Sequence, residues 1–260
     1  MHPALRHPAG LLLTLASLLT AVPAAAQTVD LAGLAHVDAH VAATPAKAEA
    51  SIAALADYLA RAGDTDLERA RAVYQWVSSN IAYDVAGFSA GEYGDLSPTG
   101  VLRRRTAVCS GYAGLVESLG EAMGLEVEVV SGWSKGYGYR AGGAVGLGTN
   151  HAWNAVRIDG EWRLMDPTWG AGYIDERIRF VRRAQDHYFL TDPGAFILDH
   201  FPEDPRWQLL DEPVTRAEYA EMIFLRPHFF ANRLEIRSHR RGRIVTDDRL
   251  DYAHQVGFYD

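Results

Sequence analysis

The chain has 260 residues, of which 48% are hydrophobic and 10% aromatic, which is enough to bury a full core. Its 33 acidic residues outnumber the 25 basic ones, giving a formal net charge of -8 with neutral histidines. An acidic protein binds the phosphate backbone poorly, so nucleic acid is excluded as a main partner. The length favours one main domain with an extra piece.

The first 26 residues have the composition of a secretory signal peptide. The apolar run from Leu11 to Val22 is too short to span a membrane, and Ala24 and Ala26 are the small residues that precede a cleavage site. Cleavage after Ala26 removes Arg6 and no acid, so the net charge becomes -9, from 24 basic and 33 acidic residues. We expect a secreted or periplasmic protein with no membrane span in its mature chain.

Residues 27–65 are predicted to form a helical N-terminal extension, with helical apolar spacing over residues 46–61. Just before this run, His36, Asp38 and His40 alternate along the chain and would share one face of an extended strand. Such a trio could hold zinc, although solvated or capping roles are the alternative.

Residues 66–213 are predicted to form the main domain. Asp64, Thr65 and Asp66 offer N-cap side chains for a helix, and the glycine-rich residues 88–100 then predict a loop. Residues 191–213 are punctuated by proline and predict an extended wrap over the core. A β-rich C-terminal extension is predicted over residues 214–260.

Cys109 is the single cysteine of the sequence, so it cannot form an internal disulfide. It is either a small buried core residue or a nucleophile. Residues 110–123 have helical apolar spacing and Gly124 fits a C-terminal stop, so Cys109 lies at or just before a helix N-terminus. The unpaired amides and the positive dipole end there favour a thiolate.

A β-hairpin is predicted around Asp159-Gly160, a strong two-residue turn signal between two β-like runs. The runs are residues 151–158 and 161–166. If the turn has two residues, opposed residue numbers sum to 319 along the ladder. Opposed residues share a face of the sheet, so the turn decides which side chains meet.

This register places Trp153 opposite Asp166 and makes His151 and Asp166 diagonal neighbours on one face. A carboxylate in that place can hold the tautomer of an imidazole and stabilise its protonated form. Either residue alone could be a satisfied polar residue on a half-buried sheet. Together with Cys109 they form a thiol, imidazole and carboxylate relay, which favours the catalytic interpretation.

The glycine-rich segment 132–148 contains a superficial dinucleotide fingerprint over residues 136–141. Two further glycines follow it instead of an amphipathic helix, so a pyrophosphate would lack its helix N-terminus. We therefore expect no nucleotide cofactor, and we interpret the segment as a loop over a cleft.

A set of ordered segments lies at residues 68–77, 80–84, 108–113, 150–154 and 166–170, with later ones at 188–193 and 200–205. These segments resemble the transglutaminase-like cysteine enzymes, and most closely the kyphoscoliosis-peptidase type. The similarity spans about residues 66–230. It implies a papain-like α+β core in which the nucleophile opens a helix that packs on an antiparallel sheet.

By this resemblance Cys109 is the nucleophile, His151 the general base and acid, and Asp166 the orienting carboxylate. The backbone amide of Cys109 is a natural oxyanion donor, and Trp76 or Tyr83 could supply a second one. Some transglutaminases depend on calcium, but the sequence has no calcium-loop pattern. No metal and no cofactor are therefore expected.

The sequence thus predicts an exported thiol enzyme that acts on peptide or side-chain amide bonds through an acyl-thioester. Hydrolysis, as a peptidase or amidase, is favoured because water is the default acceptor. The alternatives are a protein-glutamine acyltransferase that cross-links or deamidates, and a non-catalytic module that binds peptides or cell-wall strands. The expected partner is a protein or peptide substrate, including cell-wall peptide.

Overall fold

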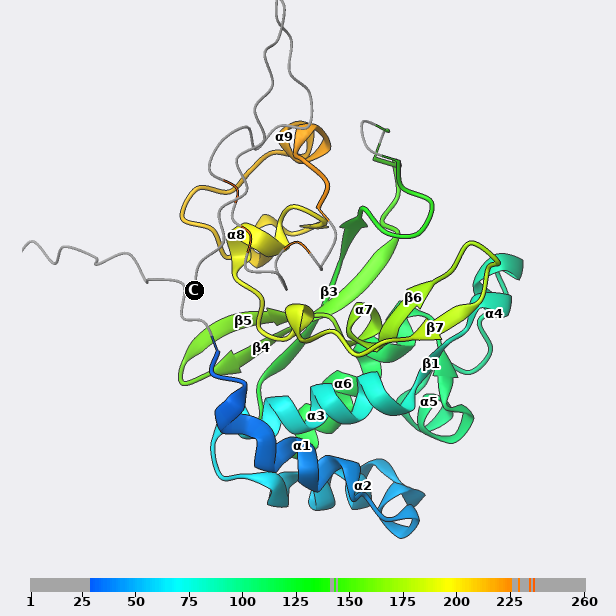
Figure 1. The fold of residues 1–260 in the computed structure, drawn as a ribbon, viewed down its shortest axis with the longest axis vertical. Helices are drawn as coiled ribbons and strands as arrows, with labels where there is room; N and C mark the ends of the chain where they lie inside the picture. The colour runs from blue at the N-terminus through cyan, green and yellow to red at the C-terminus, as the bar shows by residue number, and fades with distance from the viewer. Residues whose placement is uncertain are drawn as a thin grey trace, which may run out of the picture.

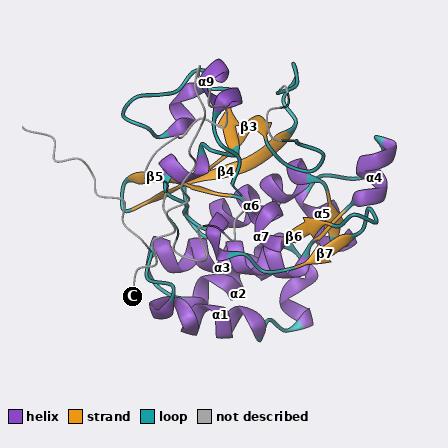
Figure 2. Ribbon diagram, turned by 45° about the horizontal axis from the view of Figure 1, so that its top comes forward, coloured by secondary structure: helices purple, strands orange, loops and turns teal. Residues whose placement is uncertain are grey.

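The computed structural model describes residues 29–140, 143, 145–225, 229, 234 and 236. Helices pack against an antiparallel sheet, so the predicted α+β class is confirmed (Figures 1 and 2). The predicted signal peptide, residues 1–26, lies outside the described part of the chain. Within that part, no helix has the length and apolar character needed to cross a membrane.

The central sheet has four strands in the order β5-β4-β3-β8. Their bounds are β3 Val127–Ser134, β4 His151–Ile158, β5 Glu161–Met165 and β8 His200–Pro202. Asp159 and Gly160 connect β4 to β5 with positive φ angles of 51° and 85°, as a tight hairpin turn requires. Ile158 pairs with Glu161, so the predicted register is confirmed.

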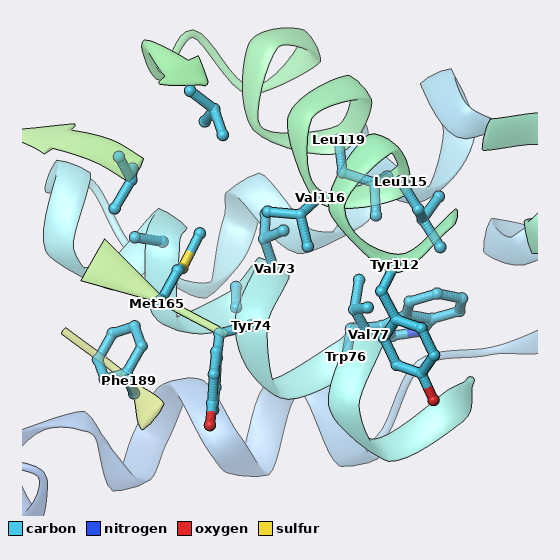
Figure 3. Close-up of a cluster of buried hydrophobic side chains, with 14 of the residues drawn as sticks. Val73, Tyr74, Trp76, Val77, Tyr112, Leu115, Val116, Leu119, Met165 and Phe189 are labelled. Carbon is cyan, nitrogen blue, oxygen red and sulfur yellow. The ribbon is translucent and has the colours of Figure 1, made fainter. Parts of the chain in front are cut away.

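Two long helices, α3 (Asp66–Asn80) and α6 (Cys109–Ala122), pack on each other and on β4. A capping box between Thr65 and Glu68 begins α3, and Gly124, with a φ of 83°, follows the end of α6. Cys109 is therefore the first residue of a helix that packs on an antiparallel sheet, as predicted. Figure 3 shows the apolar side chains of this core: Val73, Tyr74, Trp76, Val77, Tyr112, Leu115, Val116, Leu119, Met165 and Phe189.

The described part of the N-terminal extension is helical and packs into the same core. It contains η1 Ala32–Leu34, α1 Ala35–Ala42, η2 Ala46–Ala50, α2 Ile52–Leu59 and η3 Ala60–Ala62. The helical run predicted over residues 46–61 is interrupted at Ser51, whose backbone is extended. The Ser51 hydroxyl accepts the N–H of Ala54 at 3.1 Å and so starts α2 as a new helix.

The strand predicted around His36, Asp38 and His40 is wrong, because these residues lie in helix α1. On a helix, Asp38 is rotated by about 200° from both His36 and His40, which share a face at a spacing of four residues, so the three side chains do not converge. Each has a separate partner at 2.8–2.9 Å: Glu68 for His36, Arg71 for Asp38, and the Tyr58 carbonyl for His40. The buried Arg71 also binds Asp186, so Asp38 serves an ion-pair network that fastens α1 to α3.

The remaining elements are short. They are β1 Ala82–Tyr83, α4 Val85–Ala90, α5 Pro98–Arg104, β2 Thr106–Ala107, α7 Pro167–Ala171, β6 Gly172–Ile174, β7 Phe180–Arg182, η4 Asp186–Tyr188, α8 Pro193–Phe196, η5 Pro205–Gln208 and α9 Arg216–Glu221. The loop predicted over residues 88–100 is partly wrong, since α4 overlaps its start and Ser97 caps α5 at its end. Most of the predicted β-rich extension, residues 214–260, lies outside the described residues.

Candidate active site

Cys109 opens onto a cavity of about 610 Å³. The residue before it, Val108, is the N-cap of α6 and has an extended backbone and no side-chain hydrogen bond to the helix. The first amides of α6 therefore have no capping side chain. A partial positive charge remains at the helix start beside the thiol.

His151 and Asp166 make the contact that the hairpin register predicts. His151 begins β4, and its Nε2 donates to Asp166 Oδ2 at 2.7 Å. The regular ladder ends one pair earlier, at Asn154 and Met165, because Asp166 leaves the strand to cap α7. Asp166 Oδ1 accepts the backbone N–H groups of Thr168 and Trp169 at 2.8 and 3.2 Å. One carboxylate oxygen thus holds the helix and the other holds the imidazole.

The Cys109 sulfur interacts with the His151 ring and with the backbone N–H of Ala152. Because His151 Nε2 is bonded to Asp166, the ring faces the sulfur with Nδ1. Burial opposes ionisation of the thiol, but the hydrogen bond and the positive charge of His151 outweigh it and lower the pKa of Cys109. This lowered pKa favours the nucleophilic thiolate.

The pKa of His151 moves the other way. Burial alone would lower it, but the charge and hydrogen bond of Asp166, followed by the contact with Cys109, raise it above the usual range. For Asp166, burial favours the neutral acid, but the charge and hydrogen bond of His151 and then the contact with His200 hold its pKa well below the usual range. These shifts all favour a thiolate and imidazolium pair backed by a carboxylate.

His200 is a member of this cluster that the sequence analysis did not single out. It begins β8 and is fully buried, and its Nε2 lies 3.1 Å from Asp166 Oδ2. In the sequence, His200 is marked only by its place in the segment 200–205 that carries the family resemblance. The donor atoms of His151, Asp166 and His200 lie within 4.8 Å of one another. The Nε2 atoms of His151 and His200 both lie at hydrogen-bond distance from Asp166 Oδ2. The three side chains therefore form one connected hydrogen-bond network.

Aromatic side chains dominate the described walls of the cavity. They are Tyr83, Phe88, Tyr93, Tyr137, Tyr139, Trp169, Tyr173, Phe180, Tyr188 and Phe224. Four of them, Phe88, Tyr93, Tyr137 and Tyr173, are also among the most exposed large apolar residues. The glycine-rich residues 136–139 line the same cavity, as the sequence predicts for a loop over a cleft. The cavity thus has an apolar rim around a strongly polar cluster.

The structure also distinguishes the two candidates for a second oxyanion donor. Trp76 is fully buried in the core between α3 and α6 and does not line the cavity (Figure 3). Tyr83 lines the cavity, and burial together with the nearby Cys109 thiolate raises the pKa of its hydroxyl. That hydroxyl therefore stays a hydrogen-bond donor throughout the working pH range.

Replacing Tyr83 by phenylalanine is expected to reduce kcat by about 10²-fold, the loss typical of one oxyanion donor. KM should change little, because the ring that lines the cavity is kept. Steady-state kinetics on a peptide substrate measure the two constants separately. Trp76→Phe is the matched control, and a larger kcat loss for that variant would contradict this assignment.

The fold and the cluster together define the class of this protein. It is an α+β protein in which a cysteine at a helix start meets a histidine and an aspartate carried by an antiparallel hairpin. Residues 53–167 match the model of the Transglutaminase-like superfamily. The domain at residues 53–167 belongs to this superfamily, which confirms the resemblance given by the sequence.

The chain is 35% identical to the human kyphoscoliosis peptidase (Homo sapiens) over 204 residues, which cover 78% of this chain and 31% of that protein. It is 38% identical to the mouse kyphoscoliosis peptidase (Mus musculus) over 167 residues, covering 64% and 25% respectively. The chain thus spans less than a third of these relatives. An arylamine N-acetyltransferase structure from Mycobacterium smegmatis has a TM-score of 0.36 and 21% identity, covering 47% of this chain and 46% of that one.

Proposed function

We propose that this protein is a thiol enzyme that attacks amide carbonyls and forms an acyl-thioester on Cys109. The observation that carries the proposal is the contact chain from the Cys109 sulfur through the His151 ring to Asp166. In the first half-reaction the thiolate adds to the carbonyl carbon. His151 then protonates the leaving amine as the C–N bond breaks.

The second half-reaction restores the enzyme. Water attacks the thioester carbonyl, His151 takes the proton from water, and the carboxylic acid leaves as the sulfur regains its negative charge. We favour hydrolysis, as a peptidase or amidase. Several aromatic residues that line the cavity are exposed to solvent, so water has access to the thioester. An amine in place of water would give cross-linking by the same cluster.

The walls of the cavity support a class of substrate. Aromatic and aliphatic side chains provide much of its described surface. The His, Lys and Asp residues in the described lining are His151, Lys135 and Asp199. Lys135 is itself buried and donates to the Met222 carbonyl at 2.9 Å. We therefore propose that the acyl part of the substrate is a peptide segment with apolar or aromatic side chains. The composition of residues 1–26 supports export, which would bring cell-wall peptides within reach.

A single assay tests the proposal. The protein is incubated with a mixture of peptides rich in apolar and aromatic residues, together with a free amine, and the products are identified by mass spectrometry. We expect cleaved peptides, and none after Cys109 has been blocked with iodoacetamide. Deamidated glutamine or an isopeptide link would instead establish the acyltransferase alternative. Peptide that binds without any covalent change would establish the binding module.

A further inference from the structure

A second imidazole and carboxylate pair adjoins Asp166. Asp166 Oδ2 accepts from His151 Nε2 at 2.7 Å and also faces His200 Nε2 at 3.1 Å. The other nitrogen of His200, Nδ1, lies 2.6 Å from Asp199 Oδ1. Asp199 Oδ2 in turn accepts the hydroxyl of Tyr188 at 3.2 Å. A continuous row of polar contacts therefore runs from Tyr188 to the imidazole that meets the thiol.

We propose that His200 is a positioning residue: held by Asp199, it fixes the Asp166 carboxylate in the orientation that His151 requires. The expected loss of activity rests on the proposed function of Cys109. The way in which His200 holds the buried Asp166 carboxylate does not depend on that function.

The bonding of Asp166 shows why a second partner is useful. Its Oδ1 takes two backbone N–H groups at the start of α7, and its Oδ2 takes His151. A fully buried carboxylate is costly unless its lone pairs are filled, and His200 supplies the fourth hydrogen bond. With four donors from three directions, the carboxylate plane cannot rotate without losing a bond.

The same geometry fixes the orientation of the His200 ring. Its two ring nitrogens face carboxylate oxygens on opposite sides, Asp199 Oδ1 at 2.6 Å and Asp166 Oδ2 at 3.1 Å. The ring is therefore held at both ends, and its contact with Asp166 has a fixed direction. The titratable groups that interact with Asp166 or Asp199 also include Cys109, His151, Lys135, His187, Tyr188, Tyr219, Tyr74, Tyr83 and Tyr112.

Packing is the alternative role for this ring. Phe196 stacks on His200 with a centroid distance of 4.1 Å, and Trp169 lies at 4.4 Å. A phenylalanine at position 200 would keep these contacts and lose both hydrogen bonds. A glutamine would lose the stacking but keep an N–H group that can reach Asp166. The two substitutions therefore separate positioning from packing.

The experiment measures His200→Gln and His200→Phe, each first shown to be folded by circular dichroism and thermal unfolding. We expect His200→Phe to lose about 10- to 100-fold in kcat with KM nearly unchanged, and His200→Gln to lose several-fold less. His40→Gln, a matched substitution in α1 away from the cavity, should leave both constants unchanged. The opposite order, with His200→Phe as active as the parent protein, would overturn the proposal in favour of packing.

A second readout needs no substrate. The rate of iodoacetamide alkylation of Cys109 is followed against pH, and its midpoint reports thiolate formation. We expect this midpoint to rise by about one pH unit in His200→Phe, because an Asp166 carboxylate that is held less firmly stabilises the His151 imidazolium less, and the imidazolium in turn favours the thiolate. An unchanged midpoint would overturn the proposal. If the unmodified protein turns over no peptide, the proposed function fails, while the alkylation profiles still decide the role of His200.

If neither variant at position 200 folds, Asp199→Ala provides the test. It removes the partner that orients the His200 ring and deletes no packed ring. We expect its alkylation midpoint to rise in the same direction and by less. A midpoint equal to that of the parent protein would show that Asp199 and His200 do not position Asp166.

Discussion

Replacing Cys109 by alanine is expected to reduce peptide hydrolysis by at least about 10⁴-fold, because no other described side chain can form the thioester. The substitution removes one sulfur atom from a half-buried position at the start of α6, so the fold should be kept. The residual rate should be that at which water hydrolyses a bound peptide whose carbonyl is polarised by the oxyanion donors alone.

Intact-protein mass spectrometry checks this prediction directly. The parent protein, mixed with substrate and quenched with acid, should carry an acyl adduct, and Cys109→Ala should carry none. Ser79→Ala, a surface substitution on α3, serves as the control and should form the adduct normally. Full biological activity of Cys109→Ala would instead support the non-catalytic binding module.

The substitution Asp166→Asn is expected to lower kcat by about 10⁴-fold while it preserves the fold. The new amide oxygen can still accept the backbone N–H groups that cap α7. Its NH₂ group, however, now faces His151 Nε2 and can only donate. The proton of His151 is then forced onto Nδ1, which faces Cys109, so the ring cannot take a proton from the thiol.

The pH profile of Asp166→Asn should change as well. Asp166 raises the pKa of His151, so its loss lowers that pKa, and the alkaline limb of activity should move to lower pH. Activity measured across the pH range is compared with that of Asp204→Asn, a capping carboxylate at η5 that does not line the cavity. An alkaline limb that does not move would show that Asp166 does not control His151.

The features that the sequence predicts correctly depend on local rules. Asp159-Gly160 adopts positive φ angles that few other residue pairs tolerate, so the turn alone determines the strand register. That register brings His151 and Asp166 into contact. Likewise, the spacing of residues 110–123 places Cys109 at a helix start. These inferences need no knowledge of distant parts of the chain.

The features that the sequence does not predict depend on distant contacts. His200 reaches Asp166 because β8 pairs with the end of β3, and the short segment that carries it has no periodicity of its own. The alternation around His36 looks like a strand, but packing of α1 on α3 makes it helical. The choice between Trp76 and Tyr83 also depends on which ring the core buries, and this cannot be read from their positions, one inside α3 and the other shortly after it.

The two-residue turn at Asp159-Gly160 lies at the far end of the hairpin from His151. The number of residues in this turn nevertheless determines whether His151 and Asp166 share a face of the sheet. Side chains alternate between the two faces of a strand, so one added or deleted turn residue would carry Asp166 to the face opposite His151. A change of two residues would restore the face but displace the carboxylate along the strand by about 7 Å. We therefore expect this turn to keep its length of two residues wherever the His151 and Asp166 contact is kept.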